Sequence, residues 1–262
     1  PYAFSNFTQL TKLTVNYGKI NVVADNAFMN TTIEWLSLSH NDIEQLPSLT
    51  DISATLKNFY FSGNKIASIP ESYFTELKQL NIIQLFRNQL THFPNLRGFD
   101  LYSIEIWENR ISHLEDSHIE NLTIRILDIR DNTITYIAPI LLISELTYLF
   151  LDSNPLHEVP DSHFYALFES LPKLQHLGLN RCYLTKFLNN GPANLTFRRT
   201  TPLTIQLAGN KLTSLPALEG LHVETLSLDY NDIEIKDGII EKLGHLRHLY
   251  LRNSNITTLQ PI

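Results

Sequence analysis

The chain has 262 residues, of which 43% are apolar and 18% are charged. This composition supplies enough apolar side chains for a sizeable core and excludes an intrinsically disordered chain. The formal net charge is −7 and the basic residues do not cluster, so nucleic acid and anionic membranes are poor candidate partners. The longest uninterrupted apolar stretch, residues 164–168, is far too short to insert into a membrane.

A leucine-rich pattern, L-x-x-L-x-L-x-x-N-x-L, recurs from one end of the chain to the other. It is clearest in the copies that begin at Ile33, Leu80, Ile124 and Leu146. Eleven copies are recognised, and their asparagine position, here called the ladder position, holds in chain order Gly18, Asn41, Asn64, Asn88, Asn109, Asn132, Asn154, Cys182, Asn210, Asn231 and Ser254. Successive copies are 21 to 24 residues apart, except for two steps of 28 residues on either side of Cys182.

Each position of the pattern predicts a structural role. The Leu-x-Leu pair alternates with a period of two, so each copy is predicted to contribute one strand with one buried face. The asparagine amide carries both donors and acceptors, and is expected to satisfy backbone groups where the chain turns inward. Ten residues after the ladder position, Phe28, Phe74 and Phe164 are expected to fill the opposite wall of the core.

The copies are predicted to stack into one α/β solenoid, a single domain over residues 1–262. Parallel strands lie about 4.8 Å apart while helical segments need roughly 10 Å, so the stack is expected to curve into a horseshoe with about eleven parallel strands on its concave face. Short helices or 3₁₀ turns are expected on the convex side at residues 71–80, Asp161–Ser170 and 238–244. Neither end carries a cysteine cluster, which predicts truncated or cysteine-free caps.

These residues resemble the leucine-rich-repeat family over essentially the whole chain. The short copies, with a proline six residues and a phenylalanine ten residues after the ladder position, look like the typical extracellular subclass found in Toll-like receptors, Slit-type proteins and adhesion proteins. The resemblance implies a protein that binds other molecules, mostly through the concave face, and that is rarely an enzyme.

A narrower resemblance involves the two 28-residue steps around Cys182. This interrupted pair is similar to a group of arthropod secreted repeat proteins that includes the non-catalytic subunit of decapod shrimp luciferase, a luciferin 2-monooxygenase. The resemblance implies a repeat protein that holds a small separate catalytic chain. The near-absence of cysteine is compatible with this group, and less so with Toll-like or Slit-like ectodomains.

Three positions of each strand, six, four and two residues before the ladder position, are expected to point outward from the concave face. Both tryptophans of the chain fall on this surface. The predicted partner-binding residues are Trp35, Tyr60, Ile82, Phe86, Glu105, Trp107, Ile126, Asp128, Arg130, Tyr148, Phe150 and Asp152. Large exposed aromatic side chains ringed by polar groups are typical of a protein interface. The alternative is that these rings only stack on one another as ordinary cross-strand pairs.

Five N-x-S/T sequons predict glycosylation, at Asn6, Asn30, Asn121, Asn194 and Asn255. None lies at a concave-facing position, so glycans there would leave that face accessible. Cys182 occupies a ladder position, where a small buried thiol can replace asparagine. The alternative for Cys182 is a thiol that awaits a partner chain.

Motifs of catalysis and metal binding are absent from the sequence. The ten histidines are spread over many copies, and no H-E-x-x-H motif, cysteine pair, G-x-S-x-G motif or Gly-rich phosphate loop occurs. We therefore expect no catalytic residue, no metal and no cofactor, and an enzyme in its own right is only the third hypothesis.

The leading hypothesis is a secreted, non-catalytic scaffold that binds a protein partner on its concave face. The shrimp luciferase resemblance implies a small catalytic chain as that partner. The second hypothesis is the ectodomain of an adhesion or innate-immune, Toll-like receptor. Both hypotheses place the chain outside the cell.

Overall fold

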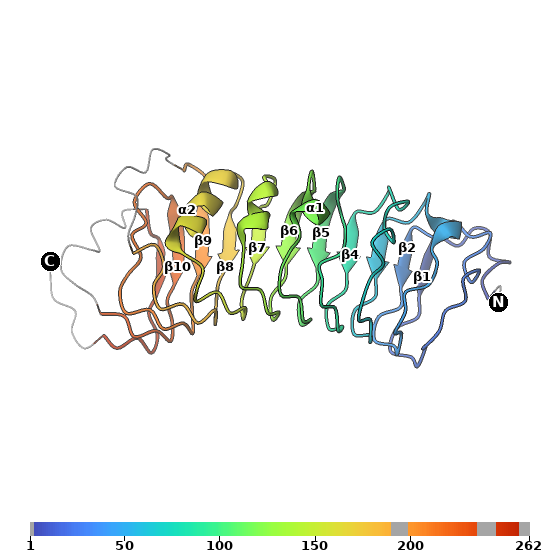
Figure 1. Ribbon diagram of the computed structural model, residues 1–262, viewed down its shortest axis with the longest axis horizontal. Coiled ribbons are helices and arrows are strands. Elements are labelled where there is room, and N and C mark those ends of the chain that lie inside the picture. The colour runs from blue at the N-terminus through green and yellow to red at the C-terminus, as the bar shows by residue number, and fades with distance from the viewer. Residues whose placement is uncertain (1–2, 190–198, 235–244, 257–262) are drawn as a thin grey trace. The chain divides into compact units, whose positions relative to one another are not determined.

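The computed structural model describes residues 3–189, 199–234 and 245–256. The chain divides into two compact units, Pro1–Asn132 (unit 1) and Thr133–Ile262 (unit 2). Within each unit, successive copies of the repeat place their strands side by side in one parallel sheet (Figure 1). The single domain predicted over residues 1–262 stays a prediction.

Unit 1 contains six short parallel strands that follow the order of the sequence. They are β1 (Lys12–Thr14), β2 (Trp35–Ser37), β3 (Asn58–Tyr60), β4 (Ile82–Gln84), β5 (Asp100–Glu105) and β6 (Thr123–Asp128). The pairing register aligns the central side chains Leu13, Leu36, Phe59, Ile83, Ile104 and Leu127, and all six are buried. The period-two pattern of one buried face is therefore confirmed.

Unit 2 contains five parallel strands, also in sequence order. They are β7 (Tyr148–Phe150), β8 (His176–Gly178), β9 (Leu203–Gln206), β10 (Val223–Ser227) and β11 (His248–Tyr250). The central side chains of β7 to β10 are buried, whereas Leu249 of β11 is partly exposed. The eleven strands predicted from the eleven copies are all present in the described residues.

The ladder asparagines satisfy backbone groups of two successive coils, as predicted. The Nδ2 of Asn64 donates to the carbonyls of Phe61 at 3.0 Å and Ser62 at 3.4 Å in its own coil, and to Leu38 at 3.0 Å in the preceding coil. Its Oδ1 accepts a hydrogen bond from the backbone N–H of Ile43 at 3.1 Å. The same arrangement recurs at Asn41, Asn88, Asn109, Asn132 and Asn231.

The far wall of the core is aromatic where the sequence predicts it. Phe28, Phe74 and Phe164 are at most 1% exposed. Phe74 packs edge-on against Phe59 of β3, with 5.5 Å between ring centroids. Because the strand side and the opposite wall meet across one apolar layer, each coil buries its side chains against its own far wall as well as against its neighbours.

The helix predictions have mixed outcomes. Helix α2 forms over Asp161–Ser170, the range predicted. Residues 71–80 form no helix but a series of separate turns, with bonds such as Tyr73 N–H to the Pro70 carbonyl and Leu77 N–H to the Phe74 carbonyl. Residues 238–244 lie outside the described residues. The sequence missed α1 (Asp116–Ile119) and the 3₁₀ helices η1 (Thr50–Ile52) and η2 (Ala138–Leu142).

The length of the coil explains this difference. The step from Asn64 to Asn88 spans 24 residues, which after the strand is too short for a helix as long as α2; the 23-residue step from Asn109 to Asn132 holds only the four residues of α1. The step from Asn154 to Cys182 spans 28 residues, which leaves room for the ten residues of α2 (Figure 1).

The coil that follows Cys182 is tied to both ends of α2. At the start of the helix, the Asp161 carboxylate accepts the backbone N–H groups of Leu188 at 2.9 Å and Asn189 at 3.0 Å. At the end of the helix, the Arg199 guanidinium donates to the carbonyls of Phe168 and Leu171 at 3.1 and 2.8 Å. The two 28-residue steps are therefore one structural feature, in which the second long coil packs on the helix of the first.

Candidate functional site

The predicted partner-binding residues lie on the face of each sheet opposite the core, which we call the open face. In unit 1 they form three parallel rows, because neighbouring strands pair in equivalent register. The first row holds Lys12, Trp35, Asn58, Ile82, Ser103 and Ile126, the middle row holds Thr14, Ser37, Tyr60, Gln84, Glu105 and Asp128, and the third row holds Asn16, Ser39, Ser62, Phe86, Trp107 and Arg130.

Trp35 is covered on both sides by neighbours in unit 1. The Lys12 ammonium lies 4.2 Å from the centroid of its ring, and the Tyr60 ring is 4.6 Å away at a tilt of 37°. Burial raises the pKa of the Tyr60 hydroxyl, and the nearby negative charge of Glu105 raises this pKa further. Trp35 is half-buried. The sequence analysis did not single out Lys12, although Lys12 and Trp35 both lie six residues before a ladder position and could have been assigned to the same row.

Phe86 and Trp107 form a second aromatic group. Their rings stack at 4.2 Å with an angle of only 5° between planes. The guanidinium carbons of Arg87 and Arg130 lie 5.1 and 5.9 Å from the Trp107 ring. Both rings are half-buried, so the stack is partly exposed and is held in one orientation by its cationic neighbours.

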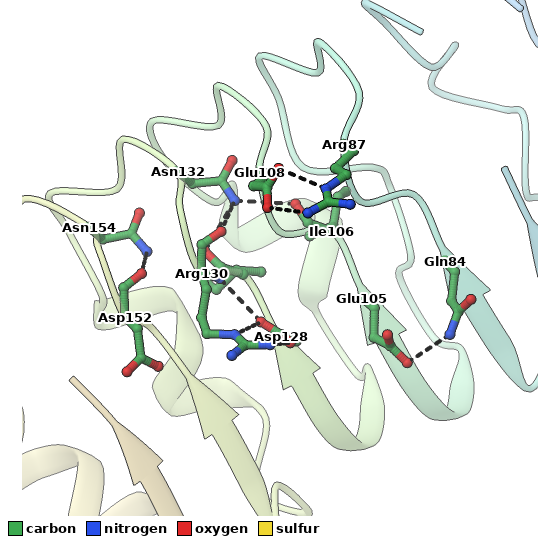
Figure 2. Close-up of polar contacts among 11 residues, drawn as sticks. Gln84, Arg87, Glu105, Ile106, Glu108, Asp128, Arg130, Asn132, Asp152 and Asn154 are labelled. Carbon is green, nitrogen blue, oxygen red and sulfur yellow. Dashed lines mark hydrogen bonds and ion pairs between the residues drawn. The ribbon is translucent and has the colours of Figure 1, made fainter. Parts of the chain in front are cut away.

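Two carboxylates lie side by side in the middle row (Figure 2). Asp128 accepts hydrogen bonds from Arg130 Nε at 2.8 Å and Nη2 at 2.7 Å, a bidentate pair. Glu105 accepts one hydrogen bond, from Gln84 Nε2 at 3.0 Å. Burial is the main cause that raises the pKa of Glu105, and the Gln84 hydrogen bond opposes this rise. On the open face, the charge of Asp128 is therefore neutralised by a bound arginine, whereas Glu105 has only one hydrogen bond from a neutral amide.

A hollow of about 520 Å³ opens on the same face of unit 1. It is lined by Lys12, Thr14, Asn16, Tyr17, Trp35, Ser37, Ser39, His40, Tyr60, Gln84 and Phe86. The Oδ1 of Asn16, one of these lining residues, accepts hydrogen bonds from Ser37 Oγ at 2.8 Å and from the backbone N–H of Ser39 at 2.9 Å. Aromatic walls over a hydrogen-bonding floor can receive a side chain or loop of a partner.

In unit 2, the open face carries a smaller aromatic group. The Phe150 ring lies 6.5 Å from Tyr148 and 5.0 Å from His176 on the next strand. Asp152 accepts the backbone N–H of Asn180 at 3.0 Å, and its Oδ2 would lie only 2.3 Å from a Cβ added to Gly178. The absence of a side chain at Gly178 therefore makes room for the Asp152 carboxylate.

The exposure of three predicted residues needs correction. The side chains of Tyr60, Asp128 and Asp152 are expected from their positions to be accessible, but these residues are only 8%, 5% and 9% exposed. Their neighbours cover them: Trp35 lies against Tyr60, Arg130 binds Asp128, and the next strand covers Asp152. The other nine are half-buried or exposed. Cross-strand stacking and partial exposure thus occur together.

Curated proteins of similar sequence cover most of this chain. Keratocan of Danio rerio is 28% identical over 90% of this chain and 71% of its own length, and keratocan of Gallus gallus is 26% identical over 90% of this chain and 59% of its own. Lumican of Bos taurus is 27% identical over 91% of this chain and 70% of its own. No protein-family model matches. Keratocan and lumican are small leucine-rich proteoglycans, and these matches span 90–91% of this chain. This chain is a leucine-rich-repeat protein.

Solved structures agree with this assignment. A leucine-rich-repeat protein of Leptospira interrogans, LIC12759, superposes with a TM-score of 0.63 at 25% identity, over 99% of this chain and 65% of that one. An internalin of Listeria monocytogenes, InlF, superposes with a TM-score of 0.61 at 21% identity, over 94% of this chain and 74% of that one. The predicted fold class, a leucine-rich-repeat solenoid with eleven parallel strands, is confirmed.

Cys182 is buried in the ladder of the leucine-rich-repeat fold. Its Sγ lies 3.4 Å from the Leu151 carbonyl and 3.5 Å from the Asn180 carbonyl, where other copies place an asparagine amide. Burial raises the pKa of the Cys182 thiol to about 12. The buried geometry supports the structural role predicted for this residue.

The burial of Cys182 predicts how the stability of the protein depends on alkaline pH. Because the folded pKa lies above the ordinary value of 9.0, the thiol keeps its proton in the folded state while the unfolded chain loses it. The free energy of unfolding should therefore fall as the pH rises from about 9 towards 12, and Cys182→Ala should weaken this decline. Urea midpoints at several alkaline pH values measure it. A native thiol that reacts with an aromatic disulfide reagent as fast as the urea-unfolded thiol would contradict the buried state.

The described sequon asparagines Asn6, Asn30, Asn121 and Asn255 are all exposed, and Asn194 lies outside the described residues. Asn30 and Asn121 have left-handed backbone conformations, with φ of 60° and 57°, at equivalent places eleven residues before a ladder asparagine. Their glycosylation stays a prediction.

The described residues contain neither a metal-binding cluster nor a membrane-spanning helix. No group of three His, Cys, Asp or Glu side chains in ranges 3–189, 199–234 and 245–256 is arranged to hold a metal ion. Within the same ranges, no helix has the length and apolarity needed to cross a membrane.

Proposed function

We propose that this leucine-rich-repeat protein is a non-catalytic extracellular scaffold that binds a protein partner through the open face of its sheets. The observation that carries the proposal is the Phe86–Trp107 stack of unit 1, which is half-buried and flanked by two arginines. Aromatic and arginine side chains are the residues most enriched at the energetic centres of protein interfaces.

The rigidity of this stack favours binding. A side chain that is already fixed loses little conformational entropy when a partner covers it. The Trp107 ring is fixed by Phe86 on one side and by arginines, and Arg87 is itself held by Glu108 at 2.9 Å. The open face of unit 1 therefore presents an ordered aromatic surface with a polar surround.

The relatives support an extracellular location. Keratocan and lumican are secreted proteins of the extracellular matrix. The chain spans between 59% and 71% of the keratocan and lumican lengths given above, so the location and partners of the whole protein belong to the proposal.

Two finer forms of the function differ in the partner. The 28-residue steps around Cys182 support a subunit that holds a small catalytic chain, as the shrimp luciferase resemblance implies. The alternative is the ectodomain of an adhesion or innate-immune receptor. Mass spectrometry of the protein isolated from its native source separates them, since a co-purifying small chain favours the subunit. A transmembrane segment in the full-length gene favours the receptor.

Trp107→Glu tests the proposed function. The glutamate removes the ring and places a charge in the Phe86–Trp107 aromatic group, so partner affinity should fall tenfold or more, since anchor residues contribute roughly 2–4 kcal/mol. The thermal midpoint should fall by only a few degrees, because a partly exposed aromatic pair contributes about 0.5–1.5 kcal/mol.

The measurement uses immobilised wild-type protein, Trp107→Glu and a control, Tyr136→Glu. Tyr136 is an exposed aromatic residue outside the rows of the open face. Extracellular fluid of the source tissue is passed over all three, and retained proteins are identified by mass spectrometry. A partner retained by wild type and control but lost by Trp107→Glu supports the proposal, whereas equal retention by all three contradicts it.

A further inference from the structure

Glu105 is the carboxylate of the unit 1 open face that has the least compensation. It lies in the middle row between Gln84 of β4 and Asp128 of β6. Its carboxylate accepts the single hydrogen bond from Gln84 and, among the described residues, forms no ion pair. A carboxylate can accept about four hydrogen bonds, so most of its capacity is unused within the protein.

The cations nearby are engaged elsewhere. Arg130 directs its guanidinium at Asp128, and Arg87 directs its guanidinium at Glu108 with bonds of 2.9 and 3.2 Å (Figure 2). Lys12 lies over the Trp35 ring at the far end of the first row. Arg130 lowers the pKa of Glu105 from a distance, but the described residues give Glu105 no direct ion pair, whereas Asp128 and Glu108 each have one.

Apolar side chains border Glu105 in the two outer rows. The register places Ile82 and Ile126 in the row on one side, and Phe86 and Trp107 in the row on the other. Glu105 is half-buried, so part of the water around its carboxylate is already excluded, and this burial raises its pKa. A partner that binds here therefore has little further desolvation of Glu105 to overcome.

We propose that the protein partner places a lysine or arginine side chain on Glu105, with apolar partner residues packed on the surrounding isoleucines and aromatic rings. This inference rests on the proposed function, because it names the chemistry of the partner at the same face. A partly desolvated carboxylate bordered by apolar side chains in the two outer rows gains most from a partner that brings a cation and additional N–H donors. The net charge of −7 favours the approach of a basic partner as well.

Random linear peptides displayed on phage provide the test. The library is selected on the immobilised wild-type protein, and each enriched peptide is then synthesised and titrated against three variants. Glu105→Gln removes the charge with little change of shape, and Trp107→Glu disrupts the open face. Glu108→Gln is the matched control, since it removes the same charge from a carboxylate that Arg87 already compensates.

The expected result is an enrichment of peptides that carry Lys or Arg beside apolar residues. Their affinity should fall tenfold or more in Glu105→Gln and stay within about twofold in Glu108→Gln. Glu105→Lys should reject them, and should regain binding when the basic residue of the peptide is replaced with glutamate. This reciprocal exchange shows that the two charges meet, and does not depend on the stability of either variant alone.

The two proposals fail in different ways. If the enriched peptides lose affinity for Trp107→Glu but bind Glu105→Gln as well as wild type, the open face is a binding site and the role of Glu105 is overturned. If no enriched peptide loses affinity for Trp107→Glu, both the open-face proposal and the inference about Glu105 are overturned.

Discussion

Replacing Asn88 with alanine is expected to lower the free energy of unfolding by about 3–5 kcal/mol. The Asn88 amide donates to the carbonyls of Phe61 at 3.0 Å and Leu85 at 2.9 Å, and accepts the Ile66 N–H at 3.0 Å. These groups are buried, and each one left without a partner costs roughly 1–3 kcal/mol. Because the bonds join two successive coils, the loss should weaken the stacking of the repeat itself.

Urea unfolding followed by circular dichroism measures the effect of Asn88→Ala. Asn88→Asp is a second variant, which keeps the acceptor but loses the donors and adds a buried charge, so it should also be strongly destabilising. Asn21→Ala is the control, because Asn21 is exposed and its side chain forms no hydrogen bond to another described residue, so its change should stay within about 0.5 kcal/mol. If Asn88→Ala is as stable as this control, the ladder does not hold the coils together.

Arg199→Ala is expected to cost about 2–4 kcal/mol and to loosen the end of α2. The Arg199 guanidinium donates to the carbonyl of Phe168 in the last turn of the helix and to those of Leu171, Pro172 and Leu174 just after it. These carbonyls belong to the end of a helix, where no intrahelical donors remain and where a cation is favoured by the helix dipole.

Hydrogen exchange of residues 165–174, together with urea unfolding, tests the role of Arg199. Arg199→Lys should recover only part of the lost stability, because one ammonium group cannot reach all the carbonyls that the planar guanidinium joins. Arg97→Ala serves as the control, since Arg97 is exposed and pairs with Glu120 on the surface at 3.0 Å. Unchanged exchange at the end of α2 in Arg199→Ala would show that the helix does not depend on this contact.

The repeated parts of the fold were predictable because their causes are local. The alternation of Leu-x-Leu indicates a strand with one buried face wherever it occurs, and the amide at the ladder position suits the turn that follows. Helix α2 was predictable because Asp161–Ser170 falls in a long coil with suitable residues. Residues 71–80 were also predicted as a helix, yet their shorter coil has no room for ten helical residues and forms separate turns. The length of the coil decided between the two segments.

The exposure of the candidate site was less predictable. Position in the strand correctly placed Trp35, Phe86 and Trp107 on one face. The same rule wrongly treated Tyr60 and Asp128 as accessible, because it ignores the size of the neighbours on adjacent strands. Those neighbours lie more than 20 residues away in the sequence, so only the pairing register between coils shows which side chain covers another.

The amino-acid sequence by itself determined the repeat, the number of strands, the buried face of each strand and the residues that share the open face. These follow from periodicities of two residues and of one coil, which the order of the residues contains directly. Only the tertiary structure decided which charges are compensated. Asp128 and Glu105 occupy the same row, yet one meets Arg130 and the other meets only Gln84, because the partner of a side chain depends on which coil stacks beside it.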